Sequence, residues 1–95
     1  MIKLIGHAAV DSGQLIIVDP CYLENWKDGE MDDLKSHYGQ ACRATDNKRR
    51  AGEVLVSGIQ GHGVAFGTGG DGGFPVFAHY RRDGSISKVE IRNLW

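Results

Sequence analysis

The sequence has few cysteines and no long hydrophobic run. Cys21 and Cys42 are its only cysteines, so no disulfide framework is indicated and a reducing cytosol is the expected compartment. The longest aliphatic run, Leu15–Val18, is far too short to cross a bilayer. The first residues also lack the apolar core of a signal peptide. These absences argue against a disulfide-rich secreted protein, and we expect no contact with a membrane.

An excess of one charge is also missing. Lysine and arginine number 11 against 12 acidic residues, which gives a formal net charge of -1. Binding of nucleic acid by bulk electrostatics is therefore excluded, although a local site for a charged ligand is not. A chain of 95 residues with 41% hydrophobic residues has the size of one folded domain, and we predict a single domain over residues 1–95.

The spacing of metal ligands is absent as well. The residues that could supply ligands or a nucleophile are His7, His37, His62, His79, Cys21 and Cys42. They include no His-x-x-x-His and no close pair of cysteines, so we predict neither a metal nor a cofactor and assign no catalytic residue. A small hydrolase remains an alternative, built from Asp19, Cys21 and either His62 or His79.

Glycine, by contrast, is abundant. The chain has 14 glycines, and nine of them fall between Gly52 and Gly73. They alternate with apolar residues that favour burial, which is typical of strands with turns, bulges and close backbone approaches rather than of a linker.

The hydrophobic pattern predicts an α+β fold, a curved antiparallel β-sheet or a partly closed barrel of about six strands with one helix packed against it. The expected strands cover residues 2–10, 14–19, 53–59, 62–68, 74–82 and 86–93. The second strand has a continuous apolar run and is expected to be covered on both faces, or at least to be central in its sheet. Tight turns are predicted at Gln60–Gly61 and Asp83–Gly84.

One helix is predicted in the middle of the chain. Its expected buried stripe consists of Met31, Leu34, Tyr38, Ala41 and Thr45, spaced by three or four residues. Acidic residues precede this stripe and basic residues follow it, which suits the helix dipole. Gly39 is expected to weaken the middle of the helix.

The most unusual segment surrounds Asp71. It runs from Gly67 to Pro75, and its predicted ligand contacts are Thr68, Gly69, Gly70, Asp71, Gly72, Gly73 and Phe74. Its bare amide groups could wrap an anion, with Asp71 accepting from a hydroxyl or an amine. The lysine and the helix of a P-loop are missing. The alternative is a wide connection with a β-bulge, in which Asp71 caps its own turn.

Arginines beside aromatic rings form a second candidate site. Arg81 and Arg82 follow Tyr80, and guanidinium groups bind phosphate while a ring can stack on a base. Asp19 and Tyr22, after the second strand, could line a pocket, or they could serve a structural turn and the core. The predicted ligand contacts thus include Tyr80, Arg81, Asp19 and Tyr22.

Three motifs support a resemblance. They are Ser12-Gly13-x-Leu15-Ile16-Ile17-x-Asp19-Pro20-Cys21-Tyr22, Gly70-Asp71-Gly72-Gly73-Phe74-Pro75-Val76 and Asp83-Gly84-x-Ile86. This layout resembles small bacteriophage-encoded proteins, and a larger bacterial domain family of unknown function with the same motifs. The resemblance implies expression in the cytoplasm of an infected bacterial host and function by stoichiometric binding.

We therefore expect a non-enzymatic protein that binds a small anionic, nucleotide-like ligand, including sequestration of a host nucleotide immune signal. A homo-oligomer is expected by analogy with such proteins. The other alternative is an inhibitor or structural protein that acts through protein–protein contacts at Trp26, Trp95 and the acidic residues before the helix.

Overall fold

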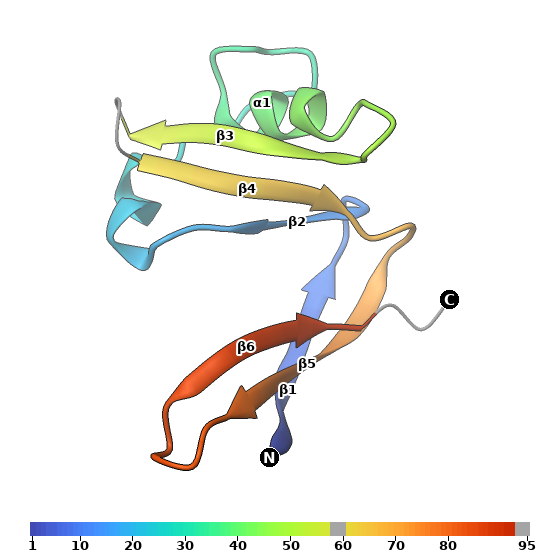
Figure 1. Cartoon of the computed structure of the whole chain (residues 1–95). Helices are drawn as coiled ribbons and strands as arrows, with labels where there is room; N and C mark the ends of the chain where they lie inside the picture. The colour runs from blue at the N-terminus through green and yellow to red at the C-terminus, as the bar shows by residue number, and fades with distance from the viewer. Residues whose placement is uncertain (58–60, 93–95) are drawn as a thin grey trace. The chain divides into compact units, whose positions relative to one another are not determined.

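The structure, a computed structural model, describes residues 1–57 and 61–92 (Figure 1). The chain divides into two compact units, one made of Met1–Gly13 with Thr68–Trp95 and the other of Gln14–Gly67. The elements, in chain order, are β1 (Ile2–Val10), β2 (Gln14–Ile17), the 3-10 helix η1 (Pro20–Asn25), α1 (His37–Ala44), β3 (Ala51–Ser57), β4 (Gly61–Gly67), β5 (Gly72–Tyr80) and β6 (Ile86–Ile91).

The predicted fold class is confirmed. The described part of the chain holds six strands in two antiparallel sheets together with one α-helix, and these strands form no closed barrel. The sheet orders are β1-β5-β6 and β2-β4-β3. In residues 1–57 and 61–92, no helix has the length and apolar character needed to cross a membrane.

In the unit of residues 14–67, β4 is the central strand and β2 lies at an edge. The prediction that the second strand is central was therefore wrong, and the strand ends at Ile17 rather than Asp19. Ile16 and Val18 pack against the core, while Ile17 is 61% exposed. Although the apolar run is continuous, only alternate residues face the core, as the period of a strand requires.

The core of this unit lies between α1 and the sheet. Its buried residues are Ala41, Val54, Val56 and Ala65. Gly52 on β3 allows α1 to approach closely, because a Cβ atom there would lie 2.7 Å from the carbonyl oxygen of Ala44. Small residues on the helix and β-branched residues on β3 thus bring the two layers together.

The helix is shorter than predicted. Met31 and Leu34 are 67% and 49% exposed and precede the helix, which begins only after Ser36. The Ser36 hydroxyl accepts a hydrogen bond from the Gly39 amide (2.9 Å) and caps the helix. No acidic residue lies in the first turn, so the expected favourable interaction of acidic side chains with the helix dipole was wrong.

Backbone contacts explain why the first half of the stripe is not helical. The His37 amide donates to the Lys27 carbonyl (2.9 Å), and the Lys27 amide donates to Nδ1 of His37 (2.6 Å). The amide of Ser36 donates to the carbonyl of Asp33 (3.0 Å). These contacts close residues 27–37 into a loop. Met31 and Leu34 therefore lie outside the helix and do not contribute to its buried face.

In the other unit, β5 is the central strand between β1 and β6. Proline is rare in a central strand because it lacks a ladder donor. Pro75 is tolerated because its nitrogen points toward Arg92, which lies just beyond the last residue of β6. The missing donor therefore falls at the end of the paired region. The Pro75 carbonyl still accepts from the Arg92 amide (3.0 Å).

The predicted Asp83–Gly84 hairpin is confirmed, since β5 and β6 pair across it and Gly84 has φ of 89°. β5 covers Gly72–Tyr80 and β6 covers Ile86–Ile91, so both strands end before the predicted limits of residues 82 and 93. β3 and β4 also pair. Residue 60 of the turn predicted between them, and Trp95, lie outside the described residues.

Candidate functional site

A cavity of about 590 Å³ lies at the C-terminal end of β5. Its lining residues are Met1, Lys3, Tyr80, Arg81, Arg82 and Gly84. The strand register assembles them, because Lys3 pairs with Ala78 on the neighbouring strand and the Tyr80 amide donates to the Met1 carbonyl (2.7 Å). We call this cavity, with its six lining residues, the cationic cavity.

The hairpin that forms one wall of the cationic cavity is held by its own hydrogen bonds. The Arg81 amide donates to the Ser85 carbonyl (2.8 Å), and the Gly84 amide donates to the Arg81 carbonyl (3.1 Å). Oδ1 of Asp83 accepts from the Ser85 hydroxyl (2.6 Å) and from the Ser85 amide (2.9 Å). The bond from the Ser85 hydroxyl is the main cause that lowers the pKa of Asp83. The turn is thus preorganised, with Asp83 ionised at neutral pH.

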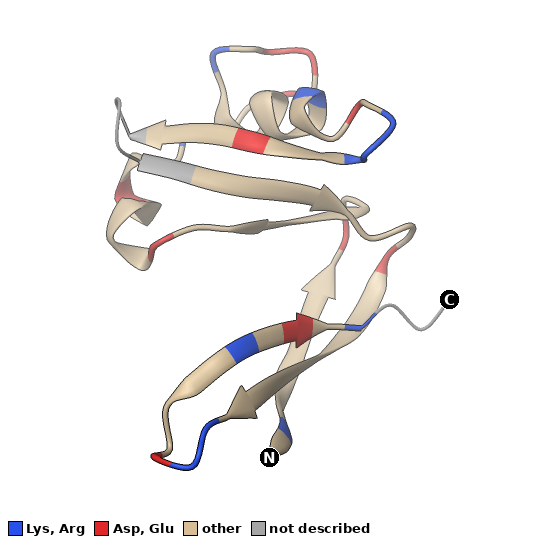
Figure 2. Cartoon of the chain, in the orientation of Figure 1, with Lys and Arg blue, Asp and Glu red and all other residues tan. Residues whose placement is uncertain are grey.

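The charge around the cationic cavity is mostly positive. Lys3, Arg81 and Arg82 contribute three cations, and the nearest acid in sequence is Asp83. Figure 2 shows blue at the start of β1 and on the loop between β5 and β6. Nη1 of Arg81 donates to the Ser85 hydroxyl (3.1 Å) and to the Ile86 carbonyl (3.2 Å). These contacts orient the guanidinium group, so an anion would meet a positioned donor rather than a flexible one.

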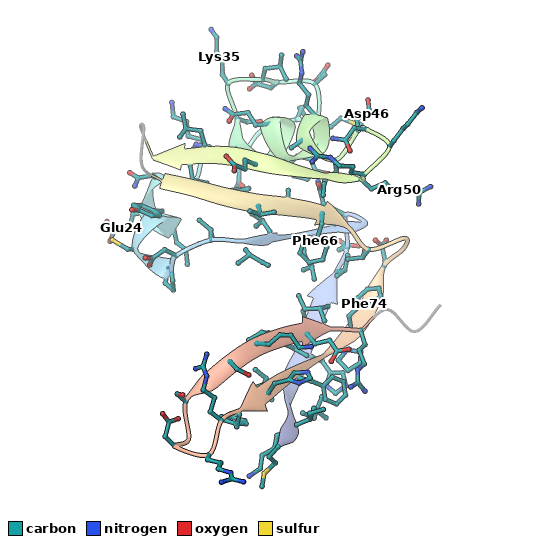
Figure 3. All side chains as sticks on the ribbon, viewed as in Figure 1. Glu24, Lys35, Asp46, Arg50, Phe66 and Phe74 are labelled. Carbon is teal, nitrogen blue, oxygen red and sulfur yellow. The ribbon has the colours of Figure 1, made fainter. Side chains whose placement is uncertain are left out.

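Tyr80 supplies an aromatic ring to the same cavity. The residue is half-buried, so part of it remains open to a ligand. Phe74, the other ring predicted to stack and labelled in Figure 3, is only 3% exposed. Tyr80 is therefore the better candidate for stacking.

The glycine-rich loop, residues 67–73, is tied to the end of β1. The Thr68 hydroxyl donates to the Gly70 carbonyl (2.7 Å), and the Thr68 amide donates to the Gly13 carbonyl (2.9 Å). Oδ1 of Asp71 accepts from the Gly13 amide (2.9 Å). Thr68 and Asp71 thus hold the connection between β4 and β5 in place, which accounts for part of the unusual composition without a ligand.

The glycines of this loop meet different needs. Gly69 has φ of 82° and Gly72 has φ of 137°, conformations that favour glycine. Gly72 and Gly73 already belong to β5 and pair with Val10 and Ala9. A Cβ atom at Gly70, Gly72 or Gly73 would meet no atom within 4 Å. The surface above these residues is therefore open, although the cationic cavity does not include them.

The predicted contacts at the loop and at Tyr80 lie at opposite ends of β5. That strand runs for nine residues, from Gly72 to Tyr80, which is roughly 26 Å at the rise of a strand. A single nucleotide is shorter than this distance. The cationic cavity and the glycine-rich loop are therefore separate surfaces rather than two halves of one small-molecule site.

Asp19 and Tyr22 belong to the other unit and have structural partners there. Oδ1 of Asp19 accepts from the Cys21 amide (2.9 Å) and caps η1, and the Tyr22 amide donates to the Asp19 carbonyl (2.9 Å). The Tyr22 side chain packs against the core. These contacts match the turn-and-core alternative for the two residues.

Two of the histidines have hydrogen-bond partners within their own unit, while the side chain of His62 lies outside the described part of the structure. His79 contacts Glu90 through Nε2 (2.9 Å), and His37 accepts from the Lys27 amide. In the part of the chain that the structure describes, no three His, Cys, Asp or Glu residues gather closely enough to hold a metal. The hydrolase alternative thus gains no catalytic arrangement from these contacts.

Three lining residues of the cationic cavity were missed in the sequence: Met1, Lys3 and Gly84. Met1 and Lys3 reach Tyr80 only through the pairing of β1 with β5, which has no signal in one sequence, whereas Gly84 belongs to the predicted Asp83–Gly84 turn and could have been found from it. Comparison of the chain with protein-family models, curated proteins and solved structures yields no match.

Proposed function

We propose that this protein is a non-enzymatic binding module that holds a small, nucleotide-like anion in the cationic cavity. The observation that carries this proposal is the convergence of Lys3, Tyr80, Arg81 and Arg82 on one cavity of about 590 Å³. Cavities of about 300–1,000 Å³ are typical of small-molecule sites.

The chemistry of the lining residues suits a phosphate joined to a planar base. Arg82 is exposed and can offer its guanidinium fork to two phosphate oxygens, while Lys3 supplies a point charge. The Tyr80 ring can stack on a base. Asp83 repels an anion that approaches the tip of the turn, which favours a pose closer to the strands than to the tip.

The biological role that fits this chemistry is sequestration. A protein that binds a nucleotide signal without a catalytic group lowers its free concentration in proportion to the amount of protein. The resemblance of the sequence motifs to those of small bacteriophage-encoded proteins is the reason for proposing this role in an infected bacterium. The glycine-rich loop is a second surface for the ligand, but the hydrogen bonds of Thr68 and Asp71 within the unit favour the cationic cavity.

The test combines a thermal-shift screen with calorimetry, using nucleoside mono-, di- and triphosphates and cyclic dinucleotides. A ligand at 100 times its dissociation constant adds about 2.7 kcal/mol to the free energy of unfolding. We expect Arg82→Ala and Lys3→Ala each to weaken binding about tenfold, since each removes a charge-assisted contact. Lys35→Ala is the matched control, because Lys35 is an exposed lysine on the loop before α1 (Figure 3).

Asp71→Ala separates the two candidate surfaces. If the ligand occupies the cationic cavity, this variant keeps the affinity of the wild-type protein. The proposal fails if no phosphate-containing compound shifts the melting temperature, or if Asp71→Ala abolishes binding while Arg82→Ala does not.

A further inference from the structure

Strand β6 lies at the edge of its sheet. In the order β1-β5-β6, and among the strands that the structure describes, it pairs on one side only. Its residues 86–89 are exposed, and the apolar side chains of Ile86 and Val89 are 48% and 53% exposed. An open edge with exposed apolar side chains is a template for pairing with another strand.

The direction of the unpaired peptide groups follows from one hydrogen bond. The Arg92 amide donates to the Pro75 carbonyl, and peptide groups alternate in direction along an antiparallel strand. Lys88 and Glu90 therefore turn their peptide groups toward β5, whereas those of Val89 and Ile91 point away from the sheet. These outward amides and carbonyls are the groups that a further strand would pair.

The opposite edge of the same sheet is less suited to pairing. The register of β1 against β5 shifts between Leu4 and Gly6, which places a bulge in the middle of that edge. Bulges are a common way in which edge strands are kept from pairing with another chain. On β6 the irregularity lies near its start, opposite His79 and Tyr80, so residues 88–91 form a regular edge.

The charges of β6 select one partner and one register. A second copy can pair with β6 antiparallel about a two-fold axis, and facing residues must then have the same peptide direction. An axis at Lys88 sets two lysines opposite each other, and an axis at Glu90 sets two glutamates opposite each other. An axis at Ile91 would lie at the last residue of β6, so the two strands would overlap only at their ends. An axis at Val89 sets Lys88 opposite Glu90 of the second copy, twice.

We propose that a second copy of this chain pairs with β6, strand against strand, about a two-fold axis through Val89. The pair forms a continuous six-stranded sheet from two three-stranded ones and covers the apolar side chain of Val89 on each copy. Figure 2 shows the blue and red segments that alternate along β6. Like charges directly opposite destabilise a strand pair and opposite charges stabilise it, so this register is distinguished from its neighbours.

The ion pairs and charge states of Lys88 and Glu90 are compatible with this pairing. Among the described residues Lys88 makes no ion pair. The Glu90 side chain is 37% exposed, and Arg92 and His79 contact its carboxylate. Hydrogen bonds from these two residues lower the pKa of Glu90 to about 2, so its carboxylate is ionised at neutral pH.

Sedimentation velocity of the full chain over a concentration series tests the proposal. We expect the wild-type protein to dimerise with increasing concentration. Lys88→Glu and Glu90→Lys, each alone, should raise the dissociation constant by about tenfold or more, because both cross-strand pairs then carry like charges. An equimolar mixture of the two variants should form a heterodimer, since two acidic side chains on one strand then face two basic side chains on the other. The matched control is Lys35→Glu, which makes the same charge change on the loop before α1.

Glu90→Lys also removes contacts with His79 and Arg92, so a second variant is needed. Val89→Pro deletes an amide that points away from β5, and proline is compatible with that side of an edge strand. It should prevent dimerisation while circular dichroism retains the signal of the folded chain. The proposal is overturned if the wild-type protein stays monomeric into the millimolar range, or if Lys88→Glu dimerises as the wild type does. If the mixture of Lys88→Glu and Glu90→Lys forms no more dimer than each variant alone, the proposed register is overturned.

Discussion

Nε2 of His79 lies 2.9 Å from Oε1 of Glu90, across the pairing of β5 with β6. Arg92 contacts the other carboxylate oxygen through Nε at 3.0 Å, and its guanidinium carbon lies 4.0 Å from the ring centroid of Phe77. These four side chains thus form a continuous chain of contacts on one face of the β1-β5-β6 sheet. The described helices both belong to the other unit, residues 14–67. Hydrogen bonds and a cation–π contact join the side chains of β5 to Glu90 and Arg92 on that face.

The first prediction concerns the pH dependence of stability. Contacts with Arg92 first, and then His79, lower the pKa of Glu90 from 4.5 to about 2. A group whose pKa is depressed by folding contributes stability above its unfolded pKa, and this contribution is lost as the pH falls from about 4.5 to about 2. Glu90→Gln should lower the stability at neutral pH and flatten the loss over this acid range.

Urea unfolding of dilute protein at a series of pH values measures this effect. Glu24→Gln is the control, because Glu24 is an exposed carboxylate for which no ion pair is found in the described residues. If the free energy of unfolding changes with pH in the same way for the wild-type protein and for Glu90→Gln, the contacts at Glu90 contribute nothing to the pH dependence of stability.

The second prediction concerns the link between Asp71 and Gly13. Asp71→Ala removes the acceptor for the Gly13 amide and should lower the free energy of unfolding by about 1 kcal/mol, the usual net value of an exposed hydrogen bond. Asp71→Asn keeps an acceptor oxygen and should lose less. Equal stability of the alanine variant and the wild-type protein would show that the loop does not need this bond, and a direct role of Asp71 with a ligand would then be favoured.

Local chemistry was sufficient to predict some parts of the fold. Asp83 and Gly84 define the β5–β6 turn through a side-chain acceptor and a positive φ, and neither depends on distant residues. The helix start could not be found in this way. The spacing of Met31 and Leu34 suits a helix, but contacts between Lys27 and His37 close that segment into a loop.

The site was only half predictable for a related reason. Tyr80 and Arg81 are adjacent in the sequence, so their aromatic and cationic character could be read directly. Lys3 joins them only through the register of β1 against β5, which one sequence does not specify. The same limit applies to β2, whose edge position depends on which strand pairs with β4.

The third prediction concerns Gly39 in α1. Gly39 is buried, and a Cβ atom there would overlap the carbonyl oxygen of Asp33 in the preceding loop. Gly39→Ala should therefore lower the free energy of unfolding by about 2 kcal/mol or more, although alanine normally stabilises a helix by about 1 kcal/mol relative to glycine. Gly70→Ala is the matched control, since a Cβ atom at Gly70 meets nothing within 4 Å. A stabilising effect of Gly39→Ala would show that the loop of residues 27–37 can move away from the helix at little cost.

The last prediction separates the two cysteines. Cys21 is exposed, whereas Cys42 is half-buried and its Sγ accepts from Nε2 of Gln14 at 3.4 Å. Access to the sulfur governs how fast a thiol meets a reagent, so the exposed Cys21 should react with Ellman's reagent about tenfold faster than Cys42. The Cys21→Ser variant assigns the fast phase. Gln14→Ala should speed only the slow phase, because Gln14 also accepts from the Thr45 hydroxyl (3.2 Å) and so ties β2 to the end of α1. A single rate for both thiols would mean that this tie opens faster than the reagent reacts, and that the edge strand β2 is only loosely attached to the helix.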